Sequence, residues 1–498
     1  MYILFVGNQG AKTSLAICQG MAAGMRACDA RWTAAYITYR DEERDWLAGR
    51  GIDERDILSF ESWVNARRDT YPDPIRLERD YPNANWSSVV ASERSFCDYS
   101  LLLDSQGQRI EPQEYTVRLI DNMVTLLEEA IRRYKPTAIV SQLADTLSSH
   151  CAFKVAQGRD IPIYSFAPGW LFEEGREQGG FLCNNEFLQS DRMAEAYARI
   201  GDRKLTAEER KRVDSLLSYI KGYRGSTTFY DRTGGDPFKA SAVSPHWRRY
   251  LRYIRDNRRL DKDVIYTKFD PWRKTRGNLL RIWRRVAASQ LFETIAIDAL
   301  PPNCVLYAMH FQPEMSTLAQ GVYWANQIAL IENISKAMPL GYTLIVKEHP
   351  VMRGFRPPWQ YRHIASLPNV ELCDAPSKEI VKRCDAVLTI TGTIAIEALA
   401  FGKPSIVFGR HFYNYCNLIR AVQEPEKLHG VLHDLLIRKN VPLPEEFKAQ
   451  VDRFLLSYLQ VLLPQYPLPE NGYDYGVALH EELASRHRPS RVAEMPVA

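Results

Sequence analysis

The sequence has no long hydrophobic run and no cysteine cluster. A membrane-crossing helix needs about 18–20 consecutive apolar residues, so we expect no transmembrane segment. The nine cysteines are scattered, with no Cys-x-x-Cys pair and no histidine at metal-ligand spacing. Unclustered thiols favour a reducing compartment over a disulfide framework or a zinc site. Residues 1–7 lack a basic segment and a cleavage site, so we predict that the protein stays in the cytoplasm.

The chain also has little excess charge of either sign. It carries 64 Lys and Arg against 60 Asp and Glu, a formal net charge of +4. This value is small for the length and argues against a dedicated nucleic-acid binder. Hydrophobic residues make up 45% and charged residues 25%, which is typical of a globular protein. A chain of 498 residues exceeds one ordinary hydrophobic core, so we expect two domains with additions.

Short apolar runs alternate with amphipathic stretches in both halves of the chain. In the first half we predict strands at 2–6, 32–39, 136–141 and 161–166, and helices at 116–134 and 147–157. In the second half we predict strands at 303–309, 342–347, 369–373, 386–390 and 404–408, and helices at 321–338, 377–384 and 393–400. Such alternation predicts parallel sheets covered by helices.

The predicted fold is therefore α/β, with two Rossmann-like domains that face each other across a cleft. The first covers residues 1–184 and the second covers residues 296–440. A helical, basic insert occupies 185–295, and residues 441–498 form helices that fold back over the first domain. We expect the tail from Arg486 onward to be disordered. Ligands of such folds bind beyond the carboxyl ends of the strands, so the cleft is the expected site.

The clearest motif lies within residues 388–404, where an apolar strand ends and the turn Thr391-Gly392-Thr393 opens a helix. We predict that this turn points free main-chain N–H groups and the positive helix end into the cleft, as a phosphate site. Glu397, one helical turn after Thr393, can accept hydrogen bonds from ribose hydroxyls. The alternatives are that Thr391 only caps the helix and that Glu397 is a solvated surface charge.

Two further motifs follow strands of the second half. His349 comes directly after the strand 342–347 and can donate to a phosphate or contact the nucleotide. It is flanked by Lys347 and by Pro350, which fixes the turn. The strand 303–309 is followed by a motif that could hold the base, the sugar or the phosphates: His310, Gln312, Pro313 and Glu314. The alternatives are a structural strand-end histidine and a polar capping loop.

The first half offers carboxylates for acid–base chemistry. Asp145 follows the strand 136–141, where it is placed to act as a base or a nucleophile in sugar transfer. Its alternative role is to cap the next helix. Glu93, with Arg94 and Asp98, lies in a less regular segment and is a second candidate for acid–base work or acceptor binding.

Two short motifs have better explanations than the function they suggest. The segment 7–14 resembles a phosphate-binding P-loop, but its glycines are misplaced, so we interpret it as the tight first turn of a Rossmann-like domain. Asp261-Lys262-Asp263 matches a metal-binding D-x-D string, but it lies in the basic insert and not at a strand end.

The insert itself combines positive charge with aromatic residues. Residues 247–285 hold fourteen Lys and Arg against four Asp, interleaved with Trp and Tyr. Amphipathic helices of this kind suit an anionic membrane surface or an acidic lipid-linked acceptor. RNA is a further candidate partner, and a solvated helical face is the alternative without a ligand.

Taken in order, the motifs resemble the capsule polysaccharide biosynthesis family. The resemblance rests on Gln-Pro-Glu at 312–314, Lys-x-His-Pro at 347–350 and Thr-Gly-Thr-x-x-x-Glu-Ala-x-x-x-Gly-Lys-Pro at 391–404. It implies a GT-B fold and β-Kdo transfer from CMP-Kdo, with Gln312 and His349 in the donor site. The resemblance also implies a catalytic carboxylate in the first domain. The last two motifs are shared with relatives of UDP-GlcNAc 2-epimerase, so the sugar and the base are implied only by similarity.

The resulting hypothesis is a metal-independent glycosyltransferase, cytoplasmic or peripheral at the inner face of the membrane. The second domain would bind a nucleotide sugar as substrate, and the first domain would present a glycan or lipid-linked acceptor to Asp145 or Glu93. We expect no cofactor, no metal and no nucleic-acid partner. The alternatives are a nucleotide-sugar epimerase or hydrolase of the same fold, and a non-catalytic scaffold that docks at the membrane.

Overall fold

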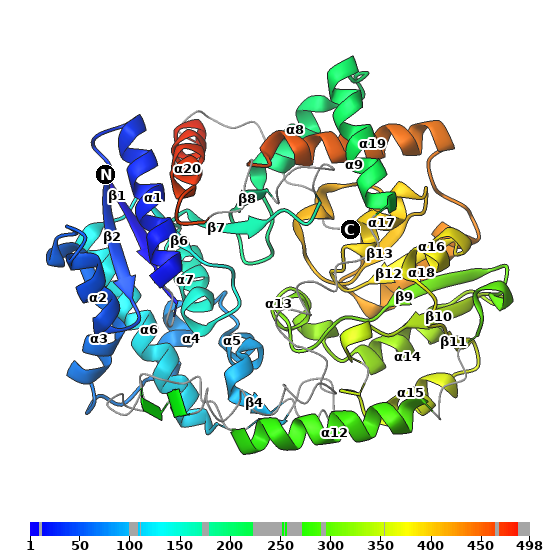
Figure 1. The fold of residues 1–498 in the computed structure, drawn as a ribbon, viewed down its shortest axis with the longest axis horizontal. Coiled ribbons are helices and arrows are strands. Elements are labelled where there is room, and N and C mark those ends of the chain that lie inside the picture. Colours follow the sequence, from blue (N-terminus) through cyan, green and yellow to red (C-terminus); the bar gives the residue numbers. More distant parts are fainter. Residues whose placement is uncertain are drawn as a thin grey trace.

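A computed structural model of the chain describes residues 1–8, 12–98, 108–109, 111–171, 179–222, 251–252, 254–255, 271–289, 295–352, 354–463 and 468–486. These residues form two lobes, each built on a six-stranded sheet with helices on its faces (Figure 1). The predicted α/β class with two Rossmann-like halves is therefore confirmed.

The first sheet has the order β3-β2-β1-β6-β7-β8. Its strands are β1 (Tyr2–Val6), β2 (Thr33–Thr38), β3 (Ile57–Ser59), β6 (Ala138–Ser141), β7 (Ile163–Pro168) and β8 (Gly180–Cys183). The first five strands are parallel, and β8 pairs antiparallel with β7. All four strands predicted for the first half are present, while the edge strands β3 and β8 were not predicted. This order is that of the Rossmann fold, in which the chain reverses direction across the sheet between β1 and β6.

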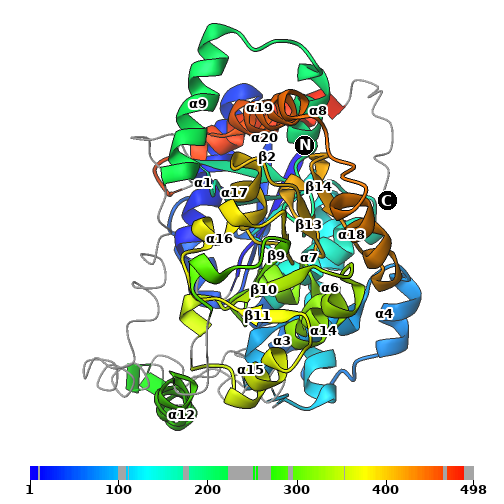
Figure 2. The same ribbon diagram turned by 90° about the vertical axis from the view of Figure 1, so that its right-hand side faces the viewer.

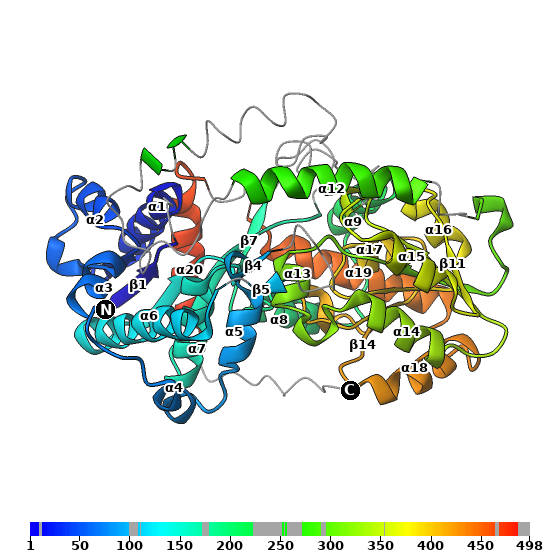
Figure 3. The same ribbon diagram turned by 90° about the horizontal axis from the view of Figure 1, so that it is seen from below.

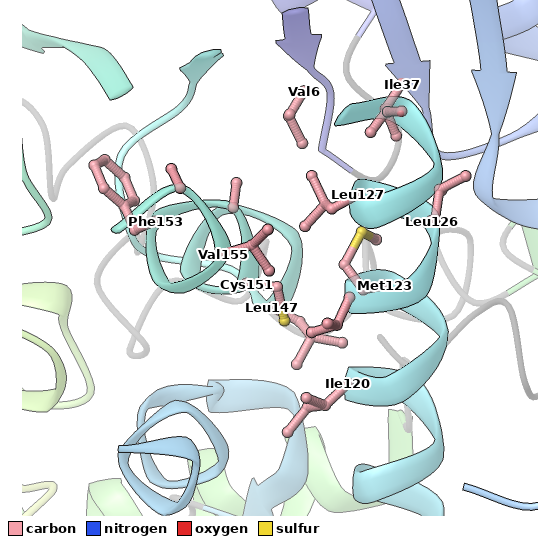
Figure 4. Close-up of a cluster of buried hydrophobic side chains, with 14 of the residues drawn as sticks. Val6, Ile37, Ile120, Met123, Leu126, Leu127, Leu147, Cys151, Phe153 and Val155 are labelled. Atoms are coloured by element: carbon pink, nitrogen blue, oxygen red, sulfur yellow. The ribbon is translucent and has the colours of Figure 1, made fainter. Parts of the chain in front are cut away.

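Two helices cover one face of this sheet and form much of the first lobe's core. They are α6 (Gln113–Tyr134) and α7 (Leu147–Gly158). Figure 4 shows Met123 and Leu127 of α6 facing Leu147 and Cys151 of α7, beneath Val6 of β1. Toward both ends of α6 the buried positions are spaced by about three or four residues, as on one helical face, whereas Leu119–Val124 are all buried.

The other face of the first sheet is covered by two helices from opposite parts of the chain. They are α1 (Lys12–Cys28) and α20 (Gly472–Arg486). A Cβ atom at Gly476 would lie 2.0 Å from the carbonyl oxygen of Met21, and one at Gly24 would lie 2.1 Å from that of Tyr473. Glycine therefore permits the two backbones to touch. Arg486, where we expected the tail to begin, ends α20, and residues 487–498 lie outside the described residues.

The second sheet has the order β11-β10-β9-β12-β13-β14, and all its pairs are parallel. Its strands are β9 (Cys304–Ala308), β10 (Thr343–Lys347), β11 (Val370–Leu372), β12 (Ala386–Thr389), β13 (Ser405–Val407) and β14 (Ile419–Ala421). Its helices are α14 (Gln327–Ala337), α15 (Pro358–Ala365), α16 (Ser377–Arg383), α17 (Ile394–Ala400) and α18 (Leu428–Leu436). All five predicted strands are present. The direction reverses between β9 and β12, as it does between β1 and β6 in the first sheet.

The helix predicted at 321–338 is shorter than expected. A 3-10 turn, η5 (Val322–Trp324), comes first, and α14 begins at Gln327. Asn326 caps this helix because its Oδ1 accepts from the N–H of Ala329 at 3.2 Å. The cap sets the boundary that apolar periodicity alone did not give.

Three more helices pack around the second lobe: α8 (Asp191–Ile200), α9 (Ala207–Gly222) and α19 (Pro444–Val461). Helix α19 contacts α8 and α9, and one hydrophobic cluster joins them to Phe181 of β8 and to α17. The remaining short elements are α2 (Asp41–Ala48), α3 (Phe60–Ala66), α4 (Pro74–Asp80), α5 (Trp86–Ser92), α13 (Met315–Leu318), β4 (Cys97–Asp98) and β5 (Gln108–Arg109).

Helix α12 (Pro271–Ser289) is the longest described helix of the basic insert. It runs along the outside of the molecule next to α15 (Figures 2 and 3). Asp261 and Asp263 lie outside the described residues, as do 9–11 of the P-loop-like segment. Across the described ranges, we find no helix with the length and apolar character that a bilayer span requires.

Candidate functional site

The strongest sequence motifs meet where the second sheet changes direction. His310 follows β9, and its Nε2 lies 2.9 Å from Thr389 Oγ1 at the end of β12. The same Nε2 accepts the N–H of Thr391 at 3.1 Å, and the N–H of Gly392 donates to Thr389 Oγ1 at 3.2 Å. Because Nε2 acts as an acceptor, the His310 ring carries its proton on Nδ1. Two motifs about eighty residues apart thus form one hydrogen-bonded unit.

This geometry changes the prediction for the turn before α17. The N–H groups of Thr391 and Gly392, expected to be free, donate within the protein instead. The donors that the turn can offer a ligand are those of the first helical turn, at Thr393 and Ile394. A Cβ at position 392 would lie 2.6 Å from Thr389 Oγ1, so glycine is needed for this close approach.

Glu397 lies on α17 and is half-buried. Burial raises the pKa of Glu397, and Lys378 opposes that rise. Lys378 itself donates to the carbonyl oxygens of Ile220 and Lys221 at the end of α9. Glu397 is therefore not the fully solvated charge that the alternative interpretation requires. Its predicted role in binding ribose hydroxyls stays a prediction.

A fully buried arginine holds the other two motifs together. Arg356 Nε donates to Glu348 Oε2 at 2.7 Å, and its Nη2 donates to the His310 carbonyl oxygen at 3.4 Å and to Gln312 Oε1 at 3.3 Å. Gln312 Nε2 donates to the carbonyl oxygen of Ala325 at 2.7 Å. Because Gln312 is 0% exposed, its side chain fixes the loop after β9 from inside the protein. The Gln312–Pro313 peptide bond in this loop is cis.

His349 is half-buried and follows β10. Its main-chain N–H donates to Glu348 Oε1 at 2.7 Å. Burial, reinforced by Lys347 and Arg356, lowers the pKa of His349 to about 4. The ring is therefore neutral near pH 7 and would serve a phosphate as a hydrogen-bond donor, not as a cation. Its ring centroid lies 6.0 Å from that of Phe311.

The flanking residues of these motifs have structural contacts. Lys347 is buried, and its Nζ donates to the carbonyl oxygen of Asp374 at 3.3 Å. Pro350 begins a 3-10 turn. Glu314 precedes α13, and its Oε2 accepts from Ser316 Oγ at 2.9 Å. None of these contacts tests a role in ligand binding.

The first-lobe carboxylates lie at the corresponding reversal point, after β6. Asp145 Oδ2 is 3.8 Å from Arg94 Nη2, while its Oδ1 is buried and has no hydrogen-bond partner among the described residues. Burial raises the pKa of Asp145, and Arg94 opposes that rise. The helix that follows is capped without Asp145, since Thr146 forms the capping box and Glu93 Oε2 accepts from the N–H of Leu147 at 2.9 Å. Buried Glu93 therefore stabilises the start of α7, whereas the Asp145 side chain takes no part in that cap and is 37% exposed.

Sequence reasoning missed two buried polar side chains beside the turn. Gln320 is 3% exposed, and neither of its amide atoms has a hydrogen-bond partner within the described ranges. His411 is 4% exposed, its Nδ1 is likewise unpaired there, and its ring centroid lies 5.1 Å from that of Trp170 in the first lobe. Burial, reinforced by His310, lowers the pKa of His411 to about 3. Buried amides and imidazoles without partners suggest a polar ligand at this place.

The two residues lie against the turn through the segment after β13. The N–H of Arg410 donates to the Gln320 carbonyl oxygen at 3.0 Å. A Cβ atom at Gly409 would lie 2.4 Å from Thr391 Cγ2 and 2.9 Å from that oxygen. The strand-end rule that selected His310 and His349 also applies to His411, which follows the predicted strand 404–408, and it was the signal available in the sequence.

The lobes contact each other near this region. Asn85 Nδ2 at the start of α5 donates to Tyr323 OH of η5 at 3.0 Å, and Arg410 lies 4.1 Å over the ring of Phe187. Within the described part of the chain, no group of three or more His, Cys, Asp or Glu side chains is arranged to hold a metal ion.

Comparison with known families agrees with the motifs of the second lobe. The capsule polysaccharide biosynthesis protein family model matches residues 323–426, which include the Lys-x-His-Pro and Thr-Gly-Thr motifs. The resemblance to this family is confirmed. The Gln-Pro-Glu motif at 312–314 lies before the matched segment. No curated protein matches the chain in sequence.

Solved structures show more distant similarity. The β-Kdo 2,4 transferase KpsC of Thermosulfurimonas dismutans is 14% identical, with a TM-score of 0.30 over 69% of this chain and 88% of that one. A UDP-GlcNAc 2-epimerase of Neisseria meningitidis bound to UDP-GlcNAc is 13% identical, with a TM-score of 0.23 over 93% and 98%. A glycosyltransferase of Rickettsia africae is 11% identical, with a TM-score of 0.27 over 98% and 99%.

Proposed function

We propose that this protein is a glycosyltransferase that moves a sugar from a nucleotide donor to a surface-polysaccharide or lipid-linked acceptor. The observation that carries the proposal is the unit formed by His310 and the turn at Thr391–Gly392 at the reversal point of a Rossmann-ordered sheet. The family match over residues 323–426 supports the same function. By resemblance to that family, the donor is CMP-Kdo.

In this proposal the second lobe binds the donor. The N–H groups at the start of α17 and the neutral His349 donate hydrogen bonds to the phosphate, which stabilises the charge that develops on the leaving nucleotide. Gln320 and His411 lie beside the turn with buried, unpaired polar atoms, and we assign them to hydroxyl or carboxylate groups of the sugar. Gln312 and Arg356 position the loop from beneath.

Asp145 of the first lobe is the proposed base. Its carboxylate, on a side chain that is 37% exposed, takes the proton from the acceptor hydroxyl as that oxygen bonds to the anomeric carbon of the sugar. The bond from the anomeric carbon to the phosphate oxygen breaks, and the nucleotide leaves with the electron pair. A carboxylate whose pKa is raised by burial is a stronger base than a solvated one.

Thermal-shift screening with CMP, UDP, GDP and dTDP tests the donor lobe, because a bound nucleotide raises the melting temperature. We expect one nucleotide to stabilise the protein and His349→Ala to weaken that effect. If none of the four stabilises it, the donor-site proposal is wrong. If His349→Ala changes neither binding nor activity, the scaffold alternative is favoured.

A transfer assay with the identified donor then tests Asp145. Asp145→Asn keeps the size of the side chain and should lower kcat about 10²–10⁴-fold without loss of nucleotide binding. Asp298→Asn, on the surface of the second lobe, is the matched control. Donor turnover without acceptor would show an epimerase or hydrolase, and full transfer by Asp145→Asn would refute the assignment of the base.

A further inference from the structure

Helix α12 exposes a stripe of large apolar side chains. Trp272 is 70% exposed, Leu279 63%, Trp283 62% and Val286 54%. Their spacing of seven, four and three residues places all four on one face of the helix. Large apolar residues gathered on a surface mark an interaction site, whereas scattered ones do not.

The opposite side of α12 attaches the helix to the second lobe. Arg284 is buried, and its Nη1 donates to the carbonyl oxygen of Phe355 at 2.6 Å. Arg281 lies 3.6 Å over the ring of Phe355, and Gly277 is buried as well. These three positions lie on the helix side away from the stripe. The helix is therefore held with its apolar face outward.

The charge of α12 is of one sign. Its nineteen residues include six Lys and Arg and no Asp or Glu, although the whole chain has a formal net charge of only +4. Arg276 is exposed and lies next to the apolar stripe, one turn after Trp272. Positive charge is thus concentrated on the element that also carries exposed Trp, Leu and Val.

This combination fits the surface of an anionic bilayer better than a nucleic acid. Tryptophan and aliphatic side chains partition into the boundary between head groups and acyl chains, while Lys and Arg contact lipid phosphates. Single-stranded RNA is bound by aromatic stacking and basic residues, and it offers no partner for exposed Leu279 and Val286. Helix α12 also lies at the edge of the molecule, next to α15 (Figure 2).

We propose that α12 docks the protein on membranes that contain anionic lipid. The helix lies parallel to the bilayer, with the stripe of Trp272, Leu279, Trp283 and Val286 inserted and Arg276 at the head groups. This inference does not depend on the proposed sugar transfer, because an epimerase or a scaffold with the same helix would dock in the same way.

Sedimentation of the full chain with lipid vesicles tests the proposal. We expect binding to phosphatidylcholine vesicles that contain phosphatidylglycerol, weak binding to pure phosphatidylcholine, and a decrease at high salt. The double variant L279S/W283S should bind at least about tenfold more weakly, because it loses most of the inserted apolar surface. Arg276→Gln should weaken binding to the anionic vesicles about fivefold.

The matched control is L340S/L443S, which removes two exposed leucines (101% and 75% exposed) that lie outside α12. All variants change exposed side chains, so their melting temperatures should equal that of the wild type. Equal vesicle binding by L279S/W283S and the control would overturn the proposal, as would no difference between anionic and neutral vesicles. Tighter binding to a single-stranded RNA oligonucleotide than to anionic vesicles would overturn it in favour of nucleic acid.

Discussion

Arg356→Met should destabilise the protein by about 3–5 kcal/mol, the cost of removing one partner from a buried ion pair. The guanidinium is 0% exposed and the Glu348 side chain is 8% exposed, with 2.7 Å between Nε and Oε2. Methionine retains most of the side-chain volume, so lost packing adds little. The cost comes from the carboxylate, which keeps Tyr361 and the His349 N–H as hydrogen-bond donors but loses its countercharge.

The assay is urea denaturation followed by tryptophan fluorescence, with thermal melting beside it. In a domain of roughly 150–250 residues each kcal/mol lowers Tm by about 2–4 °C, so the expected decrease is on the order of 10 °C. Arg383→Met is the control, because its ion pair with Asp298 has side chains that are 47% and 84% exposed. Exposed pairs contribute under about 1 kcal/mol.

A double variant separates the charge from the packing. E348Q/R356M removes the carboxylate that Arg356→Met leaves unpaired, so it should be more stable than R356M alone. If R356M destabilises the protein no more than Arg383→Met does, the buried pair does not hold the loops after β9 and β10 as argued above.

Three further predictions concern the candidate site. Burial lowers the pKa of His310 to about 3. Between about pH 6.5 and 3 the unfolded chain therefore binds a proton at this residue that the folded protein does not, and the free energy of unfolding falls as the pH decreases through this range. His310→Gln should reduce the slope of stability against pH by about 1.4 kcal/mol per unit between about pH 4 and 6, in urea titrations at several pH values. Gly409→Ala should cost about 1–3 kcal/mol, since its Cβ would lie 2.4 Å from Thr391 Cγ2, whereas Gly430→Ala, with open space around it, should not destabilise the protein in the same assay. Gln320→Leu should stabilise the unliganded protein by about 1–3 kcal/mol and reduce the thermal shift produced by a nucleotide sugar; if both quantities are unchanged, the unpaired amide has no role in binding.

The positions of most strands could be predicted from the sequence because the strands of a parallel sheet are buried on both faces. Runs such as residues 2–6 and 304–308 are apolar without interruption, and they are strands in the structure. Strand β8 was missed because it lies at a sheet edge and pairs antiparallel, an arrangement that leaves no mark in local composition. The start of α14 was missed because the cap at Asn326, and not periodicity, determines it.

The site was predictable as far as strand ends determine it. His310, His349 and Thr391 follow parallel strands of one sheet, so their common edge follows from topology. What each side chain contacts did not follow. Gln312 is turned inward to Arg356, whose position beneath two strand-end loops depends on the tertiary fold. Sequence motifs therefore identified the segments, while the division between ligand-facing and supporting side chains required the structure.

The contact between α1 and α20 bears on how the protein is made. Helix α20 covers part of the first sheet, yet it is translated more than four hundred residues after α1. Until Gly472–Arg486 leaves the ribosome, the apolar side of α1 has no cover from its final neighbour, so the first lobe cannot reach its native state before the second lobe has been synthesised. The first lobe is therefore expected to finish folding last, although its residues are synthesised first. Those residues would need chaperones for the longest time.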